Sequence, residues 1–214
     1  MEAYKNIIQI ITNKDNKYPG NLEHYFRIVW QATNVMMPYH NMRHMLHVMW
    51  NTYNGAMFYN IDGRTLRNML IAALFHDYGH TGSTADDSIN IAIAITGLDH
   101  SILPEDVPYR REITSYIKAT GVPPIEIEDT EENLPQLILR DADLSYTLED
   151  VWIQPVNFGL NVEMGISTEK ILKFQETFLT KILVLSTGWA KQKYSQKIKD
   201  RIEEANEMIK VLYP

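Results

Sequence analysis

An apolar run that ends in a histidine–aspartate pair constrains the fold of this chain more than any other feature. The run Met69–Phe75 is followed directly by His-Asp-Tyr-Gly-His at residues 76–80. Every fourth residue from Leu66 to Leu74 is a leucine, which is the spacing of a buried helix face. We therefore predict a buried helix over residues 64–75 that delivers His76 and Asp77 to the protein interior at its C-terminal end.

Two further stretches carry side chains of the same chemistry. Upstream, His40, His44 and His47 are four and three residues apart, so on a helix they project from roughly one face. Downstream, Asp141 and Asp143 close another apolar run. Neutral imidazoles and carboxylates together suit a divalent cation. We therefore expect these stretches to meet the segment 76–80 in space and to hold metal.

Composition narrows the chemistry of such a site. The chain has no cysteine, so any metal must be bound by His, Asp or Glu, and there is no disulfide framework. The net charge of −7 argues against a broad nucleic-acid-binding face. A small anionic substrate remains compatible with that charge, because bound metal ions reverse the local field.

The N-terminus and the hydropathy pattern indicate where in the cell the protein is expected. Residues 1–6 lack the charged-then-apolar layout of a signal peptide. No apolar run approaches the ~20 residues that a membrane helix needs. We therefore expect a cytoplasmic protein with no membrane association.

Helical periodicity recurs along the chain without clear strand alternation, which predicts an all-α fold. At 214 residues the chain can bury one sizeable core, so we predict a single domain over residues 1–214. Loops are expected at 13–20 and at Gly79, Gly82 and Ser83. The other expected helices cover about 3–12, 41–54, 89–98, 109–120, 169–185 (capped by Thr168) and 194–212. A helix capped by Asn21 carries Leu22 to Trp30 and is broken by Pro38, another carries Trp152, and the segment 134–146 is apolar.

Several acidic residues have simpler interpretations than metal binding. Asp86 and Asp87 stand directly before the expected helix 89–98, where carboxylates stabilise a helix N-terminus. We interpret both in that way and not as ligands. The acidic segment 123–133 is expected to be solvated surface. Asp141 is equally compatible with a helix-end carboxylate and with a residue that orients a ligand.

The motif set resembles a known superfamily. His44, the pair His76-Asp77, and Asp143 are similar to the H…HD…D signature of the HD superfamily of metal-dependent phosphohydrolases. That superfamily is all-helical, so the resemblance implies a single HD-type helical bundle.

A closer resemblance is to the catalytic domain of the cyclic nucleotide phosphodiesterases, over about residues 39–185. Residues 39–44 resemble the family's Tyr-His-Asn-x-x-His, and residues 76–82 resemble its His-Asp-x-x-His-Pro-Gly. Residues 119–120 and 142–145 match its Ala-Thr and Ala-Asp-Leu-Ser. Gln175 and Phe178 have the Gln-x-x-Phe spacing of the residues that grip the base.

The resemblance implies a metal-dependent mechanism. His44, His76, Asp77 and Asp143 would hold a first ion, a transition metal such as Zn, Fe or Mn. Asp77 would bridge to a second ion, Mg or Mn, held otherwise mostly by water. The bridging hydroxide would attack phosphorus in line. His40 would be the general acid for the leaving alkoxide.

Other residues receive supporting roles from the same resemblance. His80, His47, Thr120 and Asp141 are candidates to orient the ligands. Gln175 could hydrogen-bond a nucleobase, and Phe178 could stack on it.

The chain also departs from the family pattern. His47 stands where the family usually has Asp, Thr81 replaces its Pro, and Ala85 stands near its Asn. The span from Asp77 to Asp143 is shorter than in the family, so some loops that cover the substrate are expected to be missing.

Three functions are therefore considered. The first is hydrolysis of a nucleotide phosphodiester, above all a cyclic nucleotide, which makes a small anionic nucleotide the expected partner. The second is an HD nucleotidase or a nucleotide-polyphosphate pyrophosphohydrolase. The third is a non-catalytic nucleotide or metal sensor that keeps the pocket. The complete ligand set and His40 weigh against the third.

Overall fold

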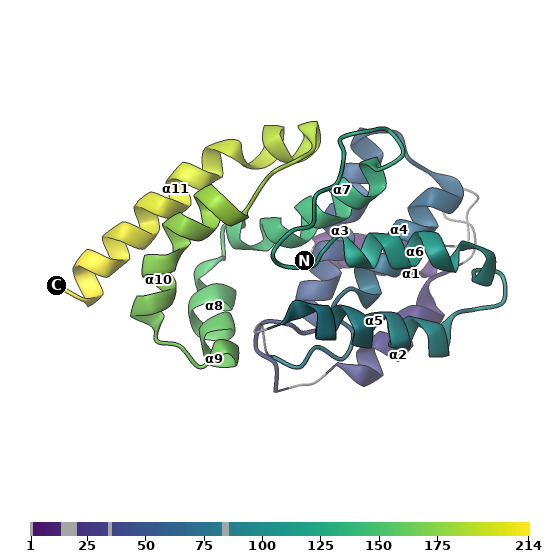
Figure 1. Ribbon diagram of the computed structural model, residues 1–214, viewed down its shortest axis with the longest axis horizontal. Helices are drawn as coiled ribbons and strands as arrows, with labels where there is room; N and C mark the ends of the chain where they lie inside the picture. Colours follow the sequence, from purple (N-terminus) through teal and green to yellow (C-terminus); the bar gives the residue numbers. More distant parts are fainter. Residues whose placement is uncertain (1, 14–20, 34–35, 83–85) are drawn as a thin grey trace.

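The computed structural model describes residues 2–13, 21–33, 36–82 and 86–214, and these residues form an all-α structure without a strand (Figure 1). The predicted fold class is confirmed at that level. Most of the expected loop 13–20, together with Ser83 and Ala85, lies outside the described residues. None of the helices in the described part is both long and apolar enough to cross a membrane.

The helices follow one another closely along the chain. They are α1 (Glu2–Thr12), α2 (Glu23–Ala32), α3 (Met42–Phe58), α4 (Gly63–Phe75), α5 (Asp87–Ser101), α6 (Arg110–Lys118), α7 (Leu134–Leu144), α8 (Ile153–Pro155), α9 (Asn161–Met164), α10 (Thr168–Thr177) and α11 (Gly188–Leu212). Short 3-10 turns are η1 (Val107–Tyr109) and η2 (Ser145–Leu148), and π-helical turns are η3 (Val156–Leu160) and η4 (Phe178–Ile182).

Helix ends differ from the sequence prediction where capping side chains decide them. The last helix begins at Gly188 and not near residue 194, because the Thr187 side chain accepts the Ala190 N–H and caps it. Ser167, not Thr168, caps α10 by accepting the Lys170 N–H. Leu22 occupies the N-cap position of α2 in place of the predicted Asn21.

Helix α4 is the centre of the main core. Every residue from Leu66 to Phe75 is buried, so the helix is covered on all sides, as its unbroken apolar run requires. It packs against α3, α6 and α7. As a result, the C-terminal end of α4 brings His76 and Asp77 to a point that α3 and α7 also reach.

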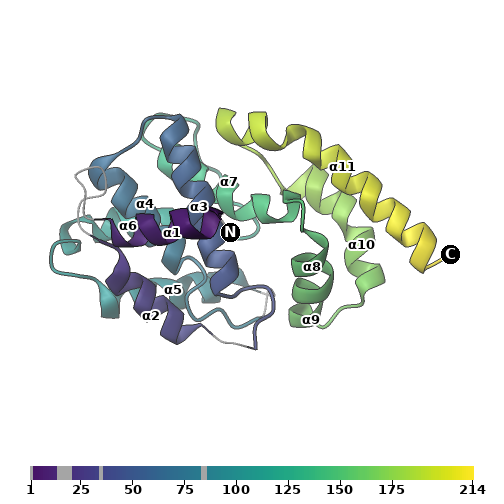
Figure 2. The same ribbon diagram turned by 180° about the vertical axis from the view of Figure 1, so that it is seen from behind.

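A second, smaller core joins α8–α11 to the rest of the molecule. It contains Tyr39, Tyr146, Trp152, Val156, Ile171, Leu172 and Ala205. Figures 1 and 2 show α8–α11 gathered at one end of the molecule, beside α7 and the group α1–α6. Because Tyr39 belongs to this core, the segment just before α3 lies where the two groups of helices meet.

A buried ionic cluster fixes α2 against α4. The Asp106 side chain is fully buried and accepts hydrogen bonds from Arg67 Nε (2.9 Å) and Nη2 (2.7 Å), from Tyr25 Oη (2.6 Å) and from Arg64. Burial would raise the pKa of Asp106, but these hydrogen bonds lower it below its ordinary value. The carboxylate therefore stays charged and holds both arginines of α4.

Candidate metal centre and adjoining cavity

Four ligand-type atoms from three parts of the chain converge at the end of α4. His44 Nε2 lies 3.0 Å from Asp143 Oδ1, 3.1 Å from Asp77 Oδ2 and 3.2 Å from His76 Nε2. His76 Nε2 lies 3.1 Å from Asp77 Oδ2 and 3.6 Å from Asp143 Oδ1. Two ligands that bind one ion at ~2.1 Å are themselves ~3.0–3.4 Å apart. The observed spacing therefore allows one metal ion to be held between these atoms.

The hydrogen bonds around these atoms leave their lone pairs free for a cation. His76 Nδ1 donates to the Ala73 carbonyl (2.8 Å), which leaves Nε2 of the neutral ring unprotonated. Asp77 Oδ2 is buried and has no hydrogen-bond partner among the described residues. Bare imidazole nitrogens and carboxylate oxygens repel one another at ~3 Å unless a positive charge lies between them. The donor set thus fits a divalent ion.

The electrostatics of the cluster agree with this assignment. Burial alone would lower the pKa of His44 and of His76. The nearby carboxylates of Asp77 and Asp143 have the larger effect, so the pKa of each histidine is raised above its ordinary value. Burial would raise the pKa of Asp143, but its interactions with His44 and His76 lower it to about 2. The site therefore attracts positive charge, either protons or a metal ion.

Local structure places each of these side chains. The Asn41 side chain accepts the Arg43 N–H and begins α3, so His44 stands in the first turn of that helix. His76 and Asp77 directly follow α4, and Asp143 is the penultimate residue of α7. The predicted meeting of the three stretches is thus observed for these four residues.

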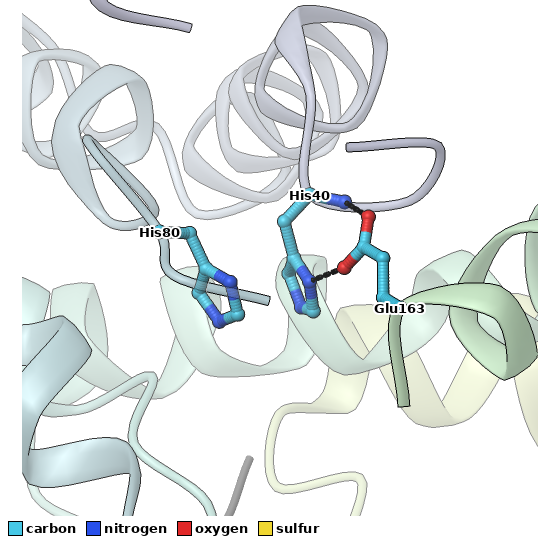
Figure 3. A group of neighbouring side chains, drawn as sticks. All are labelled: His40, His80 and Glu163. Atoms are coloured by element: carbon cyan, nitrogen blue, oxygen red, sulfur yellow. Dashed lines mark hydrogen bonds and ion pairs between the residues drawn. The ribbon is translucent and has the colours of Figure 1, made fainter. Parts of the chain in front are cut away.

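A second group of ligand-type side chains lies beside the first and consists of His40, His80 and Glu163 (Figure 3). Glu163 accepts the backbone N–H of Tyr39 (2.6 Å) and of His40 (2.9 Å), and its other oxygen lies 2.5 Å from His40 Nδ1. On the other side, the His40 ring stacks on the His80 ring, with centroids 3.6 Å apart.

These contacts are those of an oriented histidine. Stacked rings direct their nitrogen lone pairs side by side and not toward one point, and a separation of 2.5 Å between Nδ1 and the carboxylate is that of a charge-assisted hydrogen bond. Burial and the neighbouring His40 lower the pKa of His80 to about 4, so its ring is neutral near pH 7. Both groups could hold a metal ion by their donor atoms, but only the first has the converging geometry.

Sequence reasoning did not find Glu163. It lies 123 residues from His40, on the short helix α9, and no local pattern marks it. Only the packing of α9 against the segment before α3 brings its carboxylate to the histidine.

A cavity of about 280 Å³ opens beside both groups. Its polar end contains His40, Asp77, His80, Thr120 and Asp143. The rest is mainly apolar and is lined by α9, α10 and the two π-helical turns, including Val156, Leu160, Met164, Ile171, Phe174 and Ile182. The volume is close to the lower end of the ~300–1,000 Å³ typical of small-molecule sites.

The two predicted substrate residues both line this cavity. Gln175 is buried, its Nε2 donates to the Ile171 carbonyl (3.3 Å), and its Oε1 has no hydrogen-bond partner among the described residues. Phe178 follows at the start of η4 and is half-buried. The cavity therefore presents the amide oxygen of Gln175 and the aromatic ring of Phe178, besides its metal-ligand candidates.

The predicted roles of Asp141 and His47 need correction. Asp141 is not near the ligands: its carboxylate accepts the N–H groups of Ser186 (2.9 Å) and Thr187 (2.7 Å) at the start of α11. His47 accepts from Asn51 (2.7 Å) and packs on Tyr146, and it makes no hydrogen bond with a ligand. Asp87 does stand in the first turn of α5, as predicted, but its side chain also lines the cavity.

Comparison of the sequence with protein-family models and with curated proteins found no relative. No protein-family model matches the chain, and no curated protein matches it significantly. Its function is therefore inferred from its residues and their arrangement.

Proposed function

We propose that this protein is a metal-dependent phosphohydrolase of the HD type that hydrolyses a nucleotide phosphodiester, with cyclic mononucleotides as the first candidates. The observation that carries the proposal is that Nε2 of His44 and of His76 each lie 3.0–3.6 Å from carboxylate oxygens of Asp77 and Asp143, at the edge of a cavity. The resemblance of the four motif segments to the phosphodiesterase catalytic domain supports the same assignment.

These four residues would hold the tightly bound ion, and Asp77 has a second carboxylate oxygen for a further ion. A bound divalent metal would lower the pKa of a water molecule and would compensate the negative charge of the phosphoryl oxygens. The chain's own contribution is to present four ligands already in place. Asp143 and Asp77 carry the negative charge that retains a cation, and the apolar surroundings of α4 exclude competing water.

His40 would supply the proton to the leaving alkoxide. Glu163 accepts from His40 Nδ1–H and from two backbone amides, so the ring cannot turn, and Nε2 is left for the substrate. The stacked ring of His80 supports the opposite face. A donor held in this way at the edge of the cavity has the geometry required of a general acid.

The charge of the cavity favours a diester over a polyphosphate. No lysine or arginine is among the described residues that line it, whereas Asp77, Asp87 and Asp143 are. A phosphodiester carries one negative charge, which bound metal can compensate. A nucleotide polyphosphate carries several charges and ordinarily needs Arg or Lys contacts. The mainly apolar remainder suits a base and sugar.

A substrate panel tests the proposal. Metal-loaded protein is incubated with 3′,5′-cyclic mononucleotides, cyclic oligonucleotides, nucleoside monophosphates and guanosine tetraphosphate, and products are separated by chromatography. We expect turnover of a cyclic mononucleotide. Turnover of a monophosphate or of the tetraphosphate alone would instead identify the nucleotidase or pyrophosphohydrolase alternative, and binding without any turnover would identify a sensor.

A single variant tests the role of His40. His40→Ala is expected to keep its metal and to lose ~10²–10⁴ in rate, the usual contribution of a general acid. The loss should shrink with a nitrophenyl phosphodiester, whose leaving group needs no proton. The matched variant His44→Ala should lose metal and should not be rescued by that substrate. Equal losses of His40→Ala on both substrates would contradict the assignment.

A further inference from the structure

The first turn of α5 is tied to two loops that both reach the cavity. Asn90 Oδ1 accepts from Thr81 N (3.2 Å) and from Thr81 Oγ1 (2.9 Å), in the loop that follows Asp77. Asn90 Nδ2 donates to Asp87 Oδ1 (3.2 Å). Asp87 Oδ2 accepts from Val122 N (2.9 Å), in the loop after α6. A continuous chain of hydrogen bonds thus runs from one loop to the other.

The partners determine the direction of each bond. A backbone N–H can only donate, so the atom of Asn90 that faces Thr81 N must be the carbonyl oxygen. An ionised carboxylate can only accept, so the atom that faces Asp87 must be the amide nitrogen. Asn90 is 2% exposed, and a buried amide of this kind is costly to leave unsatisfied.

Each loop carries a polar side chain of the cavity. Thr81 directly follows His80, whose Nδ1 accepts from Gly82 N (3.0 Å) and whose ring stacks on His40. Thr120 lies two residues before Val122, is buried and lines the cavity. The hydrogen-bond chain therefore holds His80 on one wall and Thr120 on another.

We propose that Asn90 and Asp87 are positioning residues that together clamp the His80 loop and the Thr120 loop, so that His80 keeps the ring orientation that supports His40. The effect of the clamp on turnover rests on the proposed phosphodiesterase function. Its effect on the His80 ring does not. Asp87 thus does more than stabilise the helix N-terminus, since its carboxylate completes the link between the two loops.

The carboxylate and the amide of the clamp can be exchanged between positions 87 and 90 while each hydrogen bond named above is kept. Asn90→Asp alone places two carboxylates against each other. Asp87→Asn alone leaves one acceptor oxygen at position 87, so either the bond from Asn90 Nδ2 or the bond from Val122 N is lost. In the double variant, the new carboxylate at position 90 accepts from Thr81 and from the new amide at position 87, whose oxygen accepts from Val122 N. Donors and acceptors match again at each of these four contacts, so the double variant is expected to restore what each single variant loses.

Two measurements report whether the clamp is intact. The first is the tautomer of His80 in metal-free protein near pH 7, from imidazole ¹⁵N shifts. Wild type and double variant should carry the proton on Nε2, because Nδ1 accepts from Gly82 N, and the single variants should show mixed tautomers. The second is kcat on the diester found in the panel. Each single variant should lose about 10–100-fold, the usual effect of residues that orient a site, with KM changed little.

The control is Asn51→Ala, which removes a buried amide from α3 that bonds His47 and Lys193 outside the cavity. It should leave both the His80 tautomer and kcat unchanged. A double variant that stays as impaired as the single variants in tautomer and kcat would overturn the proposal. If the single variants do not fold, the double variant alone tests the proposal. A His80 signal like that of wild type would support the clamp, and mixed tautomers would contradict it. An absence of hydrolysis in wild type would count against the proposed function and leave the tautomer result standing.

Discussion

At the residue scale, the Glu163 carboxylate makes three contacts that converge on His40. Glu163→Gln keeps the shape of the side chain, but an amide cannot accept from the Tyr39 and His40 amides and from His40 Nδ1 together. We expect kcat to fall about 10–100-fold with unchanged metal content. As for His40→Ala, the loss should shrink with a nitrophenyl leaving group. The half-buried Glu169 on α10 lies outside the cavity lining, so Glu169→Gln is the control, and a loss of metal in Glu163→Gln would contradict the assigned role.

The raised pKa values of His44 and His76 predict how metal affinity depends on pH. A metal ion needs both imidazoles neutral, and the carboxylates of Asp77 and Asp143 raise their pKa, so protons compete from a higher pH than for an isolated histidine. The affinity for metal should therefore begin to weaken at a pH above the ordinary histidine range, and it should weaken further as the pH falls through that range. Titration calorimetry with Mn²⁺ between about pH 6 and pH 8 measures this, and a pH-independent affinity would contradict the ligand set.

At the element scale, α10 and η4 supply the wall opposite the metal ligands. Gln175 is in the last turn of α10 and Phe178 begins η4, so the two side chains share a helix face that lines the cavity. Stacking on an aromatic ring contributes ~1–3 kcal/mol per base, and ~1.4 kcal/mol is a factor of ten in affinity. Gln175→Ala and Phe178→Ala should each weaken nucleotide binding about tenfold or more.

Two controls separate base recognition from packing. Metal content and hydrolysis of a base-free phosphodiester should be unchanged in both variants, and the exposed Glu176→Ala on the same helix should bind nucleotide normally. Normal nucleotide binding with only a lowered melting temperature would mean that Gln175 and Phe178 serve the core.

At the scale of the whole molecule, the metal ligands join three helices that are far apart in sequence. His44 comes from α3, His76 and Asp77 from the end of α4, and Asp143 from α7. A ligand that binds only the folded state stabilises it by about 2.7 kcal/mol at a concentration of 100 Kd. Metal should therefore raise the melting temperature, and a chelator should lower it. His44→Ala should lose this dependence and Phe178→Ala should keep it.

The sequence by itself determined the all-α class, the buried helix that becomes α4, and the residues that form the candidate metal site. These features are encoded locally: an unbroken apolar run demands a helix covered on all sides, and adjacent His76 and Asp77 at its end must emerge where that helix is buried. One further local rule was available. Residues two apart on a helix are turned by about 200°, so Asp141 and Asp143 could not both face the same ion.

Only the tertiary structure decided which distant side chains complete the site. Glu163, on a helix of four residues, reaches His40 because α9 packs against the segment before α3. Asp141 accepts the N–H groups of Ser186 and Thr187 just before α11, and Asp87 accepts the N–H of Val122. No short-range pattern shows which N–H groups these three carboxylates accept, because packing decides which donor reaches a carboxylate. Local periodicity decides which face of a helix is buried, and the packing of helices distant in sequence decides which polar groups meet there.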